Sequence, residues 1–247
     1  MIIGGLEKFS LIDYPEHLSA IVFTKGCNFR CQFCYNPMLV WPENSASESI
    51  YDHNSPLGGD QKDYLISQDN LFDFLKERVG KLDAVVITGG EPTMHYDLPE
   101  FIKKIKKLGF KVKLDTNGTN PKMLLDVLEE KLLDYLAMDI KGSEKNYDLV
   151  TGIDPEMNKI KESIDIIMKS GLPYEFRTTL VPELHDKEII NDMGGLIKGA
   201  EKWFLQPFKS DTKLVNDTFE GASSFTEKEM DEMCQIAKKY VKQCRVR

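Results

Sequence analysis

The chain has few of the features that mark membrane, secreted or nucleic-acid-binding proteins. Its longest apolar runs fall well short of the roughly 20 residues that cross a bilayer. The first residues lack the basic start and unbroken apolar stretch of a signal peptide. The 40 acidic residues exceed the 32 basic ones, and the net charge of -8 argues against non-specific nucleic-acid binding. We expect a cytoplasmic protein that contacts neither a membrane nor nucleic acid.

Cysteine is also scarce, with five in 247 residues, yet three lie within eight positions. Cys27, Cys31 and Cys34 have the spacing C-x3-C-x2-C and directly follow the apolar run 18–24. Thiolates this close repel one another unless something positive gathers them, so the loop predicts a metal centre or a disulfide. A disulfide would leave one of the three thiols unpaired. Three ligands to a four-iron cube would leave the fourth iron open for another ligand.

The remaining cysteines and histidines bear on two alternatives. Cys234 and Cys244 lie far from the loop, which makes a disulfide framework unfavourable. We expect them to be helix or surface thiols with no role, and we expect one cluster only. A zinc site needs a fourth ligand, and neither His17 nor His53 has ligand spacing from the loop. A zinc-stabilised interaction module is nevertheless retained as a non-enzymatic alternative.

Short β-branched runs alternate with amphipathic segments along most of the chain, which predicts an α/β fold. The expected strands are 18–24, 83–88, 111–115, 134–139, 174–180 and 203–206. The expected helices are 70–79, 98–108, 121–131, 156–170, 186–199 and 226–243. Six strands each followed by a helix predict a partial (β/α)6 barrel, with residues 1–247 forming a single domain.

Three segments stand outside this alternation. Residues 1–17 precede the first expected strand, and residues 41–68 are rich in Asn, Ser, Asp, Gly and Pro, which predicts a polar insertion loop. Residues 225–247 are expected to form a C-terminal helix. Its apolar positions indicate packing on the core rather than binding of a partner.

The polar motifs all fall at the carboxyl ends of expected strands. Besides the cysteine loop they are Gly89-Gly90-Glu91-Pro92, Asp115-Thr116-Asn117-Gly118, Asp139-Ile140-Lys141-Gly142, Arg177-Thr178-Thr179 and Gln206-Pro207-Phe208. In parallel α/β folds the ligand binds at this edge of the sheet. The sequence therefore predicts one ligand site built from six segments.

The cysteine loop, with aromatic Phe33 before Cys34, resembles the signature loop of the radical S-adenosylmethionine (SAM) superfamily. Gly89, Gly90 and Glu91 are similar to that family's methionine-binding motif. The resemblance implies a [4Fe–4S] cluster on the three cysteines, whose open iron chelates the amino and carboxylate groups of SAM. Reductive cleavage of SAM would then yield methionine and a 5′-deoxyadenosyl radical. In physical terms, two glycines let backbone carbonyls approach an ammonium group, and Glu91 supplies a negative charge. The competing interpretation is a Gly-Gly turn followed by a glutamate at a helix start.

Within the superfamily, the run 8–15 and the motifs at 115–118 and 139–141 resemble those of glycyl-radical-enzyme activases. That resemblance implies a SAM and monovalent-cation site at Asp115, Thr116 and Asp139, with Asn117 and Lys141 beside it. Two carboxylates at neighbouring strand ends need a cation or a lysine between them. The alternatives are that Asp115 is a turn residue and that Asp139 and Lys141 form a structural ion pair.

Five further residues complete the expected SAM site. Arg177 is either a partner of SAM or the partner of one of the acids, because a charged residue on an interior strand needs a counter-ion. Gln206 and Phe208 are expected to close over the adenosine, with Tyr35 and Asn36 flanking it from the cysteine loop.

Over nearly the whole chain the resemblance is to activating proteins of anaerobic ribonucleoside-triphosphate reductase. It implies a protein substrate, a glycyl-radical enzyme, and an electron donor such as flavodoxin or ferredoxin. Tyr35 stands where that group often has His, and Gln206-Pro207-Phe208 where it often has Gln-Gln-Phe. The enzymatic alternative is a radical SAM enzyme that acts on a small molecule.

Overall fold

The computed structural model describes residues 1–41 and 65–247, and its contacts divide the chain into two compact units. The first unit contains residues 1–28 and 38–112, and the second contains residues 29–37 and 113–247. Most of the expected polar insertion loop, residues 42–64, lies outside the described residues.

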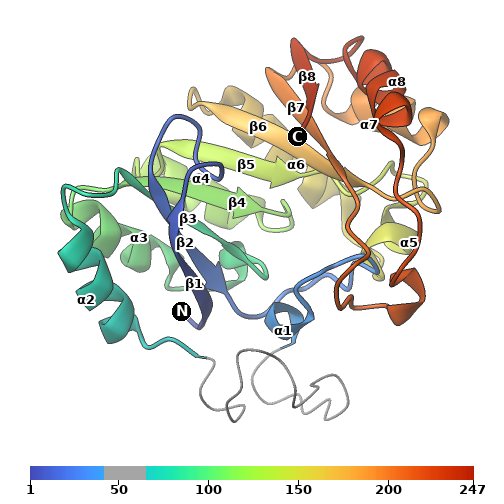
Figure 1. Ribbon diagram of the computed structural model, residues 1–247. Coiled ribbons are helices and arrows are strands. Elements are labelled where there is room, and N and C mark those ends of the chain that lie inside the picture. Colours follow the sequence, from blue (N-terminus) through green and yellow to red (C-terminus); the bar gives the residue numbers. More distant parts are fainter. Residues whose placement is uncertain (42–64) are drawn as a thin grey trace. The chain divides into compact units, whose positions relative to one another are not determined.

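The described residues of the first unit form three strands and two longer helices, whose arrangement can be followed in Figure 1. Its elements are β1 (Ile3–Ser10), β2 (Ser19–Thr24), α2 (Gln68–Arg78), β3 (Ala84–Gly89), the 3-10 turn η2 (Pro92–Met94) and α3 (Leu98–Lys107). The short helix α1 (Pro37–Val40) begins at the boundary of the two units. Strand β1 runs antiparallel to β2, and β2 runs parallel to β3.

Helix α2 begins where Ser67 caps it, its hydroxyl accepting from the Asn70 N–H at 3.1 Å. Its Phe72 ring meets Phe101 of α3 edge to face at 5.5 Å between centroids. The apolar sides of both helices are buried, so the two helices lie together against the strands.

The second unit contains five parallel strands with helices between them. Its elements are β4 (Lys111–Thr116), α4 (Pro121–Glu129), β5 (Tyr135–Asp139), α5 (Tyr147–Thr151), α6 (Met157–Lys169), β6 (Tyr174–Leu180), α7 (Lys187–Leu196), β7 (Lys202–Pro207), the 3-10 turn η3 (Asp217–Phe219), α8 (Glu227–Ala237) and β8 (Gln243–Val246). The first two residues of β4 belong to the other unit.

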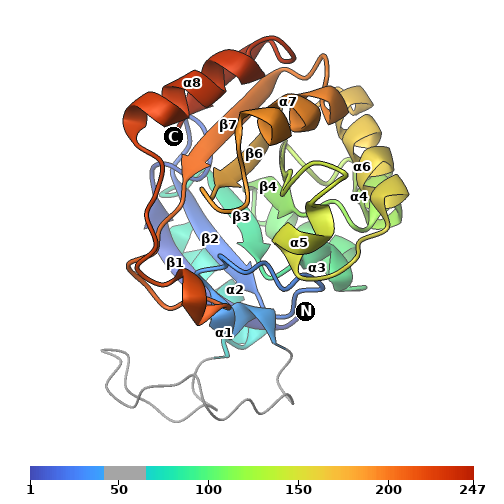
Figure 2. The ribbon, with the colours of Figure 1, turned by 90° about the vertical axis from the view of Figure 1, so that its right-hand side faces the viewer.

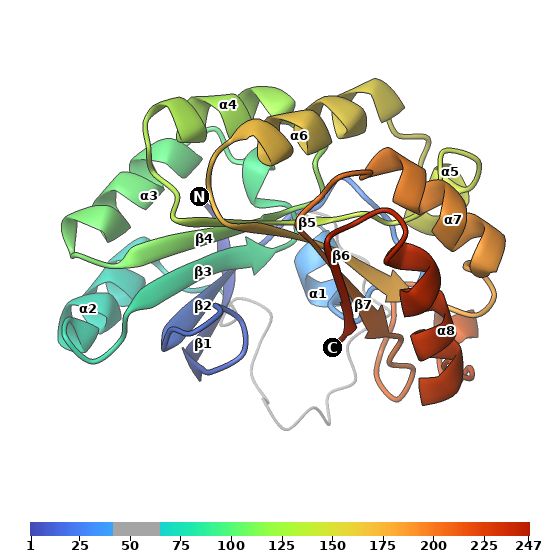
Figure 3. The same cartoon turned by 90° about the horizontal axis from the view of Figure 1, so that it is seen from above.

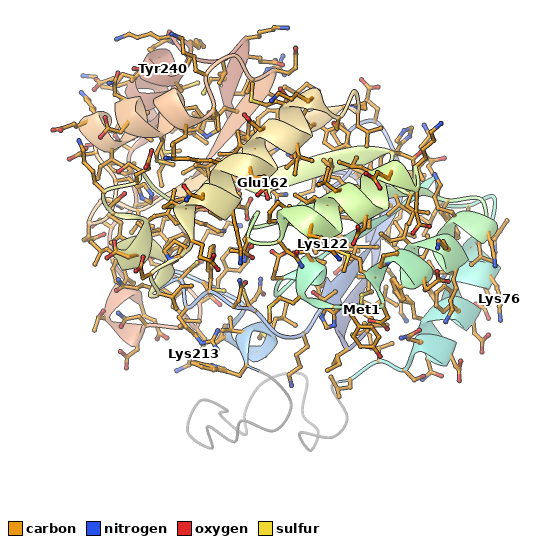
Figure 4. The ribbon with its side chains drawn as sticks, turned by 180° about the vertical axis from the view of Figure 1, so that it is seen from behind. Met1, Lys76, Lys122, Glu162, Lys213 and Tyr240 are labelled. Atoms are coloured by element: carbon orange, nitrogen blue, oxygen red, sulfur yellow. The ribbon has the colours of Figure 1, made fainter. Side chains whose placement is uncertain are left out.

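Helices α4 and α6 lie side by side over one face of the second unit's strands (Figure 3). Figure 4 shows Lys122 of α4 and Glu162 of α6 on the outer face, where both are exposed. Leu124 and Ile164 of the same helices are buried. Each helix therefore separates an apolar from a charged face, as the sequence period predicts.

Helices α7 and α8 pack against each other near β7 and β8 (Figure 2). The Tyr240 hydroxyl, beyond the end of α8, donates to the Asn191 side chain of α7 at 2.6 Å. A Cβ added at Gly194 would clash with the Tyr240 ring, so glycine permits this close packing.

The expected C-terminal helix over 225–247 is wrong beyond Ala237. Thr226 and Glu229 form a capping box that begins α8, but the helix ends at Ala237 and the chain turns into β8. The helical apolar period continues through Tyr240 and Val241, which misleads the sequence analysis. Residues 243–246 then pair in parallel with β7, with Cys244 opposite Trp203.

Cys234 and Cys244 are both buried, with 2.8 Å between their sulfur atoms. Cys234 is a helix thiol, as expected, but neither of the two is a surface thiol. They are brought together because α8 packs directly on β8.

Candidate functional site

In the first unit, the start of the cysteine loop is held by the backbone of α1. The Gly26 N–H donates to the Leu39 carbonyl at 2.7 Å, and the Cys27 N–H donates to the Val40 carbonyl at 3.0 Å. The two carbonyls belong to the last residues of α1, a helix of only four residues. The end of this helix therefore accepts hydrogen bonds from the beginning of the cysteine loop. Cys27 is therefore fixed through its own backbone.

The Gly89-Gly90-Glu91 motif packs on the same loop. The Gly90 N–H donates to the Thr24 carbonyl and the Glu91 N–H to the Gly26 carbonyl, each at 2.8 Å. A Cβ added at Gly90 would clash with that Gly26 carbonyl, so a side chain at this position would displace the residue before Cys27. Gly90 thus permits close packing on the cysteine loop, and the expected approach of the glycine carbonyls to an ammonium group stays a prediction.

The Glu91 side chain caps the 3-10 turn η2. It is 1% exposed, and one of its oxygens accepts from the Thr93 N–H at 3.1 Å and the Thr93 hydroxyl at 2.5 Å. The role at a helix start that competed with ligand binding is therefore observed.

In the second unit, the rest of the cysteine loop is bound by two segments that the sequence motifs do not include. The Arg30 N–H donates to the Thr151 carbonyl at the end of α5 at 2.7 Å. The Val215 N–H donates to the Cys34 carbonyl at 3.0 Å, and Asn216 bonds Gln32 through both backbone and side chain. These bonds fix the backbone around Cys31 and Cys34.

The side chains of this half of the loop differ in exposure. Phe33 and Cys31 are buried, whereas Tyr35 is 52% exposed. Burial raises the pKa of the Cys34 thiol, although the Asn36 backbone and the Lys141 ammonium oppose the shift. A positive charge therefore acts on a thiol that burial alone would keep protonated.

The expected acids and bases of β4, β5 and β6 form one continuous chain of ion pairs. Arg177 joins the two carboxylates, with 2.9 Å from its terminal nitrogen to Asp115 and 2.8 Å from Nε to Asp139. The second oxygen of Asp139 accepts from Lys141 at 2.9 Å, and that of Asp115 accepts from Lys113 at 2.6 Å. The ion pairs considered for Asp139, Lys141 and Arg177 are thus confirmed.

Lys113 was missed by the sequence analysis. It is 1% exposed, although a lysine two residues after Lys111 in a strand gives no sign of burial. The only available signal is the alternation along β4, which places Lys113 and Asp115 on the same face.

The two carboxyl groups of the ion-pair chain, those of Asp115 and Asp139, are held ionised. Burial would raise the pKa of Asp139, but Arg177 and Lys141 outweigh it and hold the pKa well below its usual range. Burial is likewise overcome at Asp115 by Arg177 and Lys113, which lower its pKa. The site therefore presents fixed charges at neutral pH.

The backbone of Lys141 is held from both sides. Its N–H donates to the Tyr147 hydroxyl at 3.3 Å, and its carbonyl lies 2.8 Å from Nε2 of His185. Nδ1 of His185 accepts from the Val181 N–H at 3.1 Å, so the proton of the neutral ring is on Nε2 and is donated to Lys141. Burial lowers the pKa of His185, in agreement with a neutral ring. No sequence motif pointed to Tyr147 or His185.

Thr116 and Asn117 shape the turn after β4. The Thr116 hydroxyl accepts from the Gly118 N–H at 3.1 Å, and the Asn117 side chain accepts from the Thr119 N–H at 3.0 Å. Gly118 has φ of +79° and packs on Met138, so this turn requires glycine.

The last expected segment ends β7. Gln206 pairs in register with Thr179 of β6, and Phe208 is buried with its ring 6.4 Å from that of Phe219. Burial and the Asp139 carboxylate raise the pKa of the Tyr35 hydroxyl, while Arg177 and Lys141 oppose the shift, so Tyr35 is within electrostatic reach of the ion-pair chain.

Within residues 1–41 and 65–247 no group of three or more His, Cys, Asp or Glu is arranged to hold a metal ion. The donor set is nevertheless that of an iron–sulfur site, because three cysteines occur in eight residues. Bonds to the backbone fix the loop at Cys27 and at Cys34. By their chemistry and their spacing in the sequence, the three cysteines fit a cluster with three thiolate ligands. No helix in the described parts of the chain could cross a membrane.

Comparison with known proteins gives a family match and several relatives. The model of the radical SAM superfamily matches residues 21–194, which include parts of both units. A Methanocaldococcus jannaschii protein named as a glycyl-radical enzyme activating enzyme is 33% identical, over 97% of this chain and 93% of that protein. A GTP 3′,8-cyclase of Helicobacter pylori is 28% identical over 73% of this chain, but the match spans only 50% of the cyclase.

Solved structures agree in fold. A domain of a pyruvate-formate lyase-activating enzyme from Bacteroides vulgatus has a TM-score of 0.52 at 18% identity, covering 67% of this chain and 99% of that one. Streptococcus suis SuiB bound to S-adenosylmethionine has a TM-score of 0.60 at 13% identity, covering 92% of this chain and 51% of that one. For the described residues, the α/β class with parallel strands in a sheet that is not closed is confirmed. From the family match and the full-length relative, we conclude that the chain belongs to the radical SAM superfamily of enzymes.

Proposed function

We propose that the protein is a glycyl-radical-enzyme activating enzyme. The observation that carries the proposal is the Methanocaldococcus jannaschii relative, which bears that name and matches 97% of this chain. The match spans 97% of this chain and 93% of the relative, so nearly the whole of the sequence compared supports the proposal.

Superfamily membership implies a [4Fe–4S] cluster and SAM, and we assign the cluster to Cys27, Cys31 and Cys34. When reduced, such a cluster supplies the electron that cleaves SAM to methionine and a 5′-deoxyadenosyl radical. The protein supplies position and charge. The loop backbone is anchored on α1 and on residues 215–216, and Lys141 acts electrostatically on Cys31 and Cys34. An ammonium beside the thiols favours their ionised, ligating form.

We assign SAM to the ion-pair chain and to the glycine motif. Asp115, Asp139 and Arg177 present fixed charges of both signs, which suits an amino acid moiety that carries an ammonium and a carboxylate. Gly89, Gly90 and Glu91 remain assigned to the methionyl group. Tyr35, Asn36 and Gln206 are assigned to the adenosyl side, together with Thr116 and Asn117, whose turn ends β4.

The proposed protein substrate is a glycine loop of a glycyl-radical enzyme, specifically an anaerobic ribonucleoside-triphosphate reductase. A reduced flavodoxin or ferredoxin is the proposed electron donor, and the cytoplasm the proposed location. The negative net charge of the chain favours a defined protein partner over nucleic acid.

The decisive test is formation of the glycyl radical. The reconstituted protein, SAM and a flavodoxin reducing system would be mixed anaerobically with purified anaerobic ribonucleotide reductase, and in parallel with pyruvate formate-lyase. We expect the electron paramagnetic resonance signal of a glycyl radical on the reductase, and none when its radical glycine is replaced by alanine. A signal only on the lyase would contradict the choice of partner, and no signal on either would contradict the activase assignment.

A small-molecule substrate is the second candidate, because GTP 3′,8-cyclases match over 73% of this chain. The chain spans about half of those cyclases, so it covers only part of what they contain. Incubation with GTP, SAM and reductant would decide. Conversion of GTP, followed by mass spectrometry, would favour this candidate, whereas unchanged GTP alongside glycyl-radical formation would exclude it. The zinc-stabilised module is not favoured now that the family is established.

A further inference from the structure

A fully buried lysine lies at one end of the ion-pair chain. Lys113 is 1% exposed, and its ammonium contacts Asp115 at 2.6 Å. On its other side lies the ring of Tyr135, with 5.9 Å from Nζ to the ring centroid. A buried ammonium is costly unless it is paired, so the fold uses this charge at a defined place.

The charges within the ion-pair chain do not cancel. In order they are Lys113, Asp115, Arg177, Asp139 and Lys141, three cations and two carboxylates. The neighbouring Glu175 and Arg247 pair with each other at 3.1 Å and leave this count unchanged. Among these five side chains one positive charge is therefore in excess, which favours an anionic group nearby.

The carboxylate oxygens are all engaged by cationic side chains. Those of Asp115 accept from Lys113 and Arg177, at 2.6 and 2.9 Å. Those of Asp139 accept from Arg177 and Lys141, at 2.8 and 2.9 Å. A metal cation here would add a second excess positive charge and would compete with these side chains for the same oxygens.

We propose that Lys113 is a positioning residue that replaces an alkali-metal ion as the counter-charge of Asp115, so that the carboxylate of SAM binds without a metal cation. The proposal rests on the SAM site of the proposed function. Lys113 balances the charge of Asp115, and Asp115 orients Arg177. Part of the positive charge of Arg177 and Lys141 then remains available to bind the carboxylate of SAM. The monovalent cation inferred from the activase resemblance is then unnecessary in this chain.

The test is the salt dependence of SAM binding to the anaerobically reconstituted protein, measured by isothermal titration calorimetry. Binding would be compared in potassium, sodium and tetramethylammonium chloride at equal ionic strength. We expect wild-type Kd values that agree within about twofold in the three salts. Lys113→Ala should bind SAM about tenfold more weakly in tetramethylammonium and should recover in potassium or sodium, because the small ion can occupy the vacated place.

Two further variants complete the design. Lys113→Arg retains the charge and should remain independent of the salt. Lys111→Met removes an exposed lysine from the same strand and should bind as wild type.

Wild-type binding that requires potassium or sodium would overturn the proposal without any variant, whether or not Lys113→Ala folds. A folded Lys113→Ala protein with unchanged binding in every salt would also overturn it, because Lys113 would then have only a structural role. Absence of SAM binding in all salts would instead contradict the SAM site itself. Formation of a glycyl radical is a separate measurement, so failure of the activase assignment would be distinguished from failure of this inference.

Discussion

Replacement of Arg177 tests the ion-pair chain most severely, because Arg177 links the two carboxylates of that chain, Asp115 and Asp139. Its side chain is 14% exposed and donates to Asp115 and to Asp139, which lie on different strands. Arg177→Met keeps much of the apolar stem and removes the guanidinium. Two largely buried carboxylates would each lose one of two cationic partners.

The expected loss of folding free energy is about 3–5 kcal/mol at pH 7.5, the range found when one partner of a buried ion pair is removed. The loss should shrink as the pH falls. In wild type the pKa values of Asp115 and Asp139 are lowered, so their contribution is complete above the unfolded pKa of about 4 and is lost below it. In the variant both pKa values rise, so the carboxyls take up protons at a higher pH and their burial becomes less costly.

The assay is urea unfolding of the reduced apoprotein at pH 7.5, 6.0 and 4.5, followed by tryptophan fluorescence. Trp203 is a suitable probe because it is buried on β7 and its indole donates to Thr178 of β6 at 2.9 Å. Lys187→Met, which removes an exposed ion pair with Glu232, should be indistinguishable from wild type. A loss below about 1 kcal/mol for Arg177→Met, or one that does not decrease toward pH 4.5, would refute the reasoning.

Two further predictions concern the loops around the site. Gly90→Ala should lower stability by about 1–3 kcal/mol in thermal melting, because its Cβ would clash with the carbonyl of Gly26. Gly195→Ala, where the Cβ would enter open space, should not lower stability. Equal melting temperatures for the two variants would contradict the packing at Gly90. His185→Ala should cost about 1–3 kcal/mol at pH 7.5, because it leaves the Lys141 carbonyl without its imidazole partner. Burial lowers the pKa of His185, so protonation of this ring should destabilise wild type, but not the variant, as the pH falls from 7 to 5. The difference in unfolding free energy between the two proteins should therefore narrow. A difference that widens would contradict a neutral ring.

Local signals in the sequence were sufficient for the strands that carry the site. The run from Ala84 to Ile87 is continuous and apolar, as expected of a strand buried on both faces, and it ends directly at Gly89. The Asp139 and Lys141 spacing places both residues on one side of the chain, so their ion pair could be expected. In each case the necessary information lies within a few residues.

The features that were missed depend on pairing between distant segments. Lys113 resembles a surface lysine until β5 pairs beside it and Asp115 turns toward Arg177. His185 reaches Lys141 across 44 positions, and nothing in the residues around either predicts the contact. Strands β1 and β8 were missed for a related reason. Gly4 and Gly5 interrupt the apolar pattern of β1, and β8 has only four residues.

The central claim is that the cysteine loop carries a cluster that cleaves SAM. The most direct measurement is 5′-deoxyadenosine, followed by mass spectrometry after anaerobic reconstitution with iron and sulfide and addition of SAM and dithionite. Wild type would be compared with Cys31→Ala and with Cys234→Ala, a buried cysteine outside the loop. We predict the nucleoside from wild type and from Cys234→Ala, and none from Cys31→Ala. Equal amounts from Cys31→Ala and wild type, or a wild-type protein that binds zinc and forms no cluster, would contradict the account.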